Sequence, residues 1–65
     1  MILLDDKVGD ILRRYDYLDE IFFQFTENEN LIYDEADYTL VEFCEMTGAD
    51  SDELIRALQK AISAH

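Results

Sequence analysis

The side chains best suited to soft-metal chemistry are Cys44 and His65, and the chain has one cysteine and one histidine. A zinc site needs several such ligands at close spacing, whereas these two lie far apart in the sequence. His65 is also the last residue of the sequence, where fraying of the chain is expected. We therefore expect a free terminal histidine, and we expect no metal site and no cofactor.

Cys44 is the one candidate nucleophile of the thiol type. It falls on an apolar stripe with Leu40 and Phe43, and free cysteine often packs as a small buried hydrophobe. The neighbouring carboxylates of Glu42 and Glu45 oppose formation of a thiolate. A single cysteine also forms no internal disulfide. The pattern predicts an inert core cysteine.

Carboxylates are plentiful, and the polar run between residues 28 and 38 invites a calcium interpretation. A calcium loop wants oxygen ligands at alternate positions and a glycine at the sixth. The run offers the oxygen ligands Asn28, Asn30, Asp34, Glu35 and Asp37. Ile32 interrupts the alternation of these ligands, however, and the glycine is missing. Since the sequence also has no phosphate-binding glycine loop and no serine triad, we predict a protein that is not an enzyme.

The charge balance restricts the classes of partner. Sixteen acidic residues against five basic ones give a formal net charge of −11. Such a chain is repelled by nucleic-acid phosphate and by anionic lipid, and it suits a basic protein partner or simply a soluble surface. No apolar run approaches the roughly 20 residues that span a bilayer, and the first residues do not resemble a signal peptide. We expect a cytoplasmic protein.

Start and stop signals divide the second half of the sequence into two helices. Thr39 with Glu42, and Asp50 with Glu53, have the spacing of a capping box, in which two side chains satisfy free backbone amides at a helix start. Gly48 suits the left-handed conformation that ends many helices. The spacing predicts a third helix that places Leu40, Phe43 and Cys44 together, and a fourth that continues to about Ser63.

The first half predicts two further amphipathic helices. The first runs from about Lys7 to Tyr15, with Asp6 as its cap, and the second begins at Asp16. Their apolar stripes are Val8, Ile11, Leu12 and Tyr15, then Leu18, Ile21, Phe22 and Phe25. We predict one all-α domain over residues 1–65, a compact bundle of four short helices with a longer loop at 26–38. Its small core makes a homodimer plausible.

One aromatic residue departs from this pattern. Phe23 follows Phe22 directly, so it points about 100° away from the stripe, toward the side of Asp19 and Glu20. Aromatic residues are enriched in interface cores. The alternative is that the 26–38 loop, whose apolar part includes Leu31 and Tyr33, folds over Phe23 and buries it.

Three sequence runs resemble a known domain family. They are V-G-D-I-L-R-R-Y at 8–15, L-D-E-I-F at 18–22 and T-L-V-E-F-C-E-M-T-G-A-D-S-D-E-L-I-R-A-L at 39–58. Together they resemble the hybrid-cluster-protein-associated redox disulfide domain, a small helical domain of unknown function. Its relative is the N-terminal domain of the iron–sulfur cluster repair di-iron proteins. The resemblance implies a small helical fold.

The same resemblance does not imply redox or cluster-linked activity, because this sequence departs from the family at the residues that carry it. Family members typically carry a cysteine pair in the loop after the second helix, and residues 26–38 contain no cysteine. Cys44 falls where the repair-protein branch often has a cysteine of its own. Asp16 stands where the family usually has proline.

Three functional hypotheses follow. The leading one is a protein-interaction module that docks through the second helix and the loop after it, with Phe23, Asp19, Glu20, Leu31 and Tyr33 as candidate residues. The second is a redox- or metal-associated accessory domain, with Cys44 as its candidate thiol. The third is an acidic inhibitor that mimics DNA and occupies a basic cleft.

Overall fold

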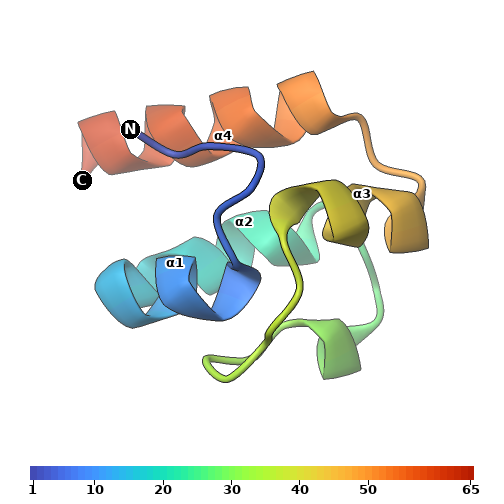
Figure 1. Ribbon diagram of the computed structural model, residues 1–65. Helices are drawn as coiled ribbons and strands as arrows, with labels where there is room; N and C mark the ends of the chain where they lie inside the picture. The colour runs from blue at the N-terminus through green and yellow to red at the C-terminus, as the bar shows by residue number, and fades with distance from the viewer.

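Two segments that lead into helices pair with each other. The computed structural model describes all 65 residues. In it the residue before helix α1 (Val8–Arg14), Lys7, forms an antiparallel bridge with Thr39, the residue before helix α3 (Leu40–Thr47). The Lys7 ammonium also lies 2.5 Å from the carboxylate of Asp37. The pairing sets the two helix starts side by side (Figure 1).

This pairing provides hydrogen-bond acceptors for the first backbone amides of both α1 and α3. The first amides of any helix have no partner within that helix, and here each helix takes carbonyl oxygens from the segment that leads into the other. The four bonds are Val8 N to Tyr38 O (2.9 Å), Gly9 N to Ala36 O (3.0 Å), Leu40 N to Asp6 O (3.0 Å) and Val41 N to Leu4 O (3.2 Å).

The remaining elements complete an all-α bundle of four helices, as the sequence predicts. The other two helices are α2 (Asp19–Phe23) and α4 (Ser51–Ala64), with short 3-10 turns η1 (Asp16–Leu18) and η2 (Glu29–Leu31). The predicted second helix is therefore wrong in extent: its first turn is 3-10, and it ends before Phe25. No helix combines the length and apolarity needed to cross a membrane.

The predicted caps are mostly confirmed. Thr39 and Glu42 form the reciprocal capping box, and Gly48 ends α3 with φ 76°. Asp50 accepts from the backbone amides of Asp52 and Glu53, although the Glu53 side chain makes no return bond. The prediction that Asp6 caps α1 is wrong. Its carboxylate instead accepts from Leu3 N at 2.9 Å, because the tertiary pairing already supplies carbonyls to the first amides of α1.

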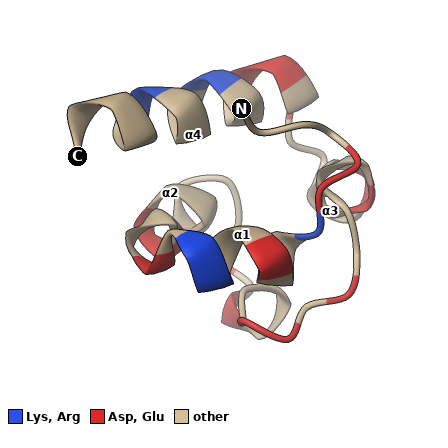
Figure 2. Cartoon of the chain, turned by 60° about the vertical axis from the view of Figure 1, so that its left-hand side comes forward, with Lys and Arg blue, Asp and Glu red and all other residues tan.

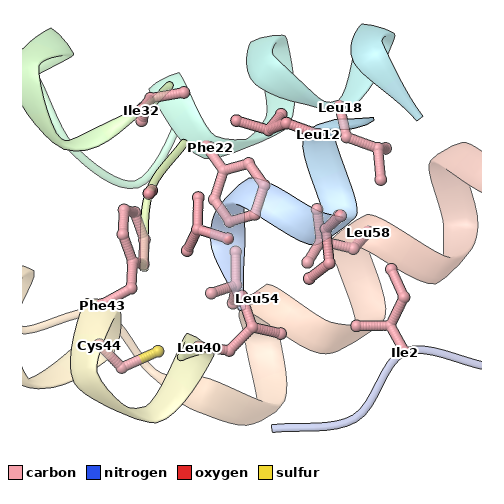
Figure 3. Packing of buried hydrophobic residues seen from close by; sticks show 13 residues of the cluster. Ile2, Leu12, Leu18, Phe22, Ile32, Leu40, Phe43, Cys44, Leu54 and Leu58 are labelled. Atoms are coloured by element: carbon pink, nitrogen blue, oxygen red, sulfur yellow. The ribbon is translucent and has the colours of Figure 1, made fainter. Parts of the chain in front are cut away.

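The core lies between α4 and the other three helices (Figure 3). Phe22 from α2 meets Phe43 from α3 edge to face, with ring centroids 5.3 Å apart. Leu54 and Leu58 of α4 are fully buried against them, and the whole cluster contains thirteen buried residues. An edge-to-face pair adds about 0.5–1.5 kcal/mol beyond its buried area.

The long loop packs on α1 through Gly9. A methyl group at that position would lie 2.6 Å from Ala36 O and 2.8 Å from Asp34 O. Arg13, one turn later, donates to the same Asp34 carbonyl at 3.0 Å. Ile32 and Ala36, which both belong to the loop, are buried. Glycine is needed here because two backbones approach closely.

We expect Gly9→Ala to destabilise the fold by about 1–3 kcal/mol, the cost typical of forcing extra atoms into a packed site. At an unobstructed helix position the same substitution stabilises, since alanine is the better helix former. Urea unfolding followed by circular dichroism measures the difference.

Gly48→Ala is the matched control. Nothing lies within 4 Å of a methyl group there, and only the left-handed backbone opposes the substitution. It should cost about 1–2 kcal/mol without moving the NMR signals of residues 34–38. A Gly9→Ala variant as stable as the wild type would show that the loop does not press on α1.

Candidate functional site

Helix α2 presents Asp19 and Phe23 on one face, a single turn apart. Phe22 is fully buried, whereas Phe23 keeps 43% of its surface exposed. The loop therefore does not cover Phe23, and the interpretation that it buries this side chain is wrong. The reason is that residues 32–36 are held against α1 by the bonds to Gly9 and Arg13.

An open depression of about 580 Å³ lies at the end of α2 and at the start of the loop. We call it the phenylalanine depression. Its lining combines two aromatic side chains with polar loop residues and one threonine from the end of α3: Phe23, Gln24, Phe25, Thr26, Glu27, Asn28 and Thr47.

A second depression, of about 410 Å³, lies where α1, η1 and the start of α2 meet the loop. We call it the acidic depression. Three aspartates stand in its lining with one tyrosine, one arginine and two apolar residues: Leu12, Arg13, Asp16, Asp19, Ile32, Tyr33 and Asp34. Leu12 and Ile32 are nearly buried, at 6% and 9% exposure, so they contribute an apolar floor.

The charges of the acidic depression are not balanced within the protein. Arg13 is engaged elsewhere, since one guanidinium nitrogen donates to the Asp34 carbonyl and another pairs with Asp10. The carboxylates of Asp16 and Asp34 form no ion pair. Asp19 accepts only from the backbone amide of Glu20, at 2.7 Å. The depression is therefore open to an added positive charge.

The ring of Tyr38 packs against the ring of Tyr33. The two rings pack edge to face with centroids 6.5 Å apart, and the Tyr38 hydroxyl is buried without a hydrogen-bond partner. Burial raises the pKa of Tyr38, and the neighbouring Tyr33 adds to that rise. Tyr33 itself keeps 47% of its surface exposed, while Ile32 beside it is buried.

The structure brings together some of the residues that the sequence singled out and separates others. Asp19 and Tyr33 share the acidic depression, and Phe23 lines the phenylalanine depression. Glu20 is exposed and lines neither depression. Leu31 is half-buried and packs against the core.

Sequence reasoning missed Asp16 and Asp34 as members of the site. Asp16 precedes Asp19 by three positions, and this helical spacing was a usable signal. Asp34 has no such signal, because only the packing of the loop on Gly9 brings it to α1.

Neither soft ligand lines one of the two depressions. Cys44 is buried at 8% exposure, and burial raises the pKa of its thiol, with a further contribution from the Asp50 charge. His65 is exposed, and its ring stacks on Tyr17 with ring centroids 3.7 Å apart, a contact that the sequence did not predict. Helix α4 continues to Ala64 and carries His65 onto η1. No three histidine, cysteine, aspartate or glutamate side chains lie close enough together to hold a metal ion.

Comparison with known proteins gives no match: no family model, no curated protein and no solved structure corresponds to this chain.

We expect the Cys44 thiol of the folded chain to react with iodoacetamide at least tenfold more slowly at neutral pH than the same thiol in urea. Only the thiolate reacts, and the raised pKa keeps the thiolate fraction low, so the rate should climb with pH into the alkaline range. Mass spectrometry of the alkylated fraction measures this rate.

Asp50→Asn tests the second cause, because asparagine still caps α4 while the charge near the thiol is removed. It should lower the pKa of Cys44 slightly. Equal reaction rates for the folded and unfolded chains at neutral pH would contradict an inert thiol and favour a redox role.

Proposed function

We propose that the protein is a non-enzymatic interaction module that docks on another protein through α2 and the 26–38 loop. The observation that carries this proposal is the 43% exposure of Phe23. A large aromatic side chain at the surface, next to a fully buried one, is the kind of residue that dominates binding energies when a partner desolvates it.

The surroundings of Phe23 support the proposal. The phenylalanine depression beside it combines apolar and polar groups, the composition of ligand and partner sites in general. Tyr33, a second exposed aromatic residue, lines the acidic depression together with Asp19. An apolar residue ringed by polar groups also resembles the core and rim of a protein interface.

The experiment compares Phe23→Asp with Val41→Asp in affinity capture from a lysate of the cells that make the protein. Val41 is a close match, because it is 40% exposed and receives the same change of charge. An acidic residue near the start of α3 also suits the helix dipole, so this control should stay folded. We expect Phe23→Asp to weaken retention of the captured partner at least tenfold, and Val41→Asp to leave it unchanged.

Sedimentation of both variants, with circular dichroism to check folding, completes the test. A change of mass confined to Phe23→Asp would make the docked partner a second copy of the chain. If Phe23→Asp alters neither the captured partner nor the mass, α2 is not the docking face.

A further inference from the structure

We infer that the occupant of this face is a short basic protein segment. It places an apolar side chain against Phe23 and an arginine or lysine side chain in the acidic depression, one helical turn away. This inference rests on the proposed docking role of α2 and adds the chemistry of the partner to it.

Charge complementarity is the first argument. No lysine or arginine occurs between Arg14 and Arg56, and all but three of the sixteen acidic residues fall in that interval. The interval contains α2 and the whole loop, and both appear without basic residues in Figure 2. The nearest cation, Arg13, is already held by Asp10 and the Asp34 carbonyl. The two ion pairs of the protein, Lys7–Asp37 and Arg13–Asp10, leave the three aspartates of the acidic depression free to bind a positive side chain of another molecule.

The shape of the acidic depression is the second argument. Lysine and arginine carry an apolar stem and a charged tip. Leu12 and Ile32 offer apolar surface to such a stem, while the carboxylates of Asp16, Asp19 and Asp34 share the lining with them. Tyr33, exposed and backed by Tyr38, offers an aromatic ring to the cation. A simple metal ion would gain no binding energy from the apolar surface of Leu12 and Ile32.

The spacing of the two depressions is the third argument. Asp19 and Phe23 are four residues apart in α2, which places them about 6 Å apart along the helix axis. Side chains two apart in an extended peptide have a similar separation, about 6–7 Å. One short segment can therefore reach both depressions at once, and it needs an apolar and a basic residue at that separation.

The test is an NMR titration of the isotope-labelled chain with acetyl-Leu-Ala-Arg-amide. The comparison peptide replaces arginine by citrulline, which has nearly the same shape and no charge. We expect the signals of Phe23 and Tyr33 to move with the arginine peptide. We also expect it to bind at least about threefold more tightly than the citrulline peptide, as for one or two exposed ion pairs. Added salt should reduce that preference.

Two double variants locate the charge effect. Asp16→Asn with Asp34→Asn removes two carboxylates of the acidic depression, whereas Asp5→Asn with Glu45→Gln removes two from elsewhere. None of the four carboxylates forms an ion pair or accepts a hydrogen bond within the protein. The first pair should abolish the preference for arginine over citrulline, and the second should retain it within about twofold, because both pairs change the net charge equally.

Two results would overturn the inference. Equal binding of both peptides by the wild type would show that the face does not select a cation. An arginine preference that survives Asp16→Asn with Asp34→Asn would place the cation elsewhere. Neither result bears on the docking role of Phe23, which is tested by the separate comparison of Phe23→Asp and Val41→Asp.

Discussion

The reciprocal pairing of the segments before α1 and α3 is the constraint on which the rest of the structure depends. Each helix is too short to be stable alone in water, and each start has amides without partners. The bridge between Lys7 and Thr39 and the bonds around it give four of those amides a carbonyl acceptor. These backbone hydrogen bonds position α1 and α3 relative to each other without any contribution from side chains. The two helices then offer adjoining apolar faces to α2 and α4.

The same pairing builds the candidate site. Because Gly9 N binds Ala36 O, the end of the long loop must lie on α1. Asp34 and Tyr33 consequently lie on the side of α1 that adjoins Asp16 and Asp19. The later part of the loop is thereby kept off Phe23, while its first residues, 26–28, line the phenylalanine depression. One backbone contact thus assembles the acidic depression and leaves the phenylalanine depression open.

Local signals in the sequence predicted the parts of the fold that depend on local physics. The Thr39–Glu42 capping box and the Gly48 stop were both predicted, since each involves atoms within one or two turns. The failures at Asp6 and Asp34 have a common origin: both positions are governed by hydrogen bonds to residues far away in the sequence, from Leu40 N to Asp6 O and from Arg13 to Asp34 O. Phe23 lies between these cases, because helical geometry gave its direction while only the packed loop decided its exposure.

Unpaired carboxylates at one depression have a thermodynamic consequence. Like charges held near one another repel in the folded state and are farther apart in the unfolded chain, so they lower the stability of a small domain that has little to spare. A cationic segment bound there would cancel that repulsion and stabilise the folded state by mass action. If the proposed basic segment binds there, docking and folding are coupled at the same three aspartates, because only the folded chain brings them together in one depression.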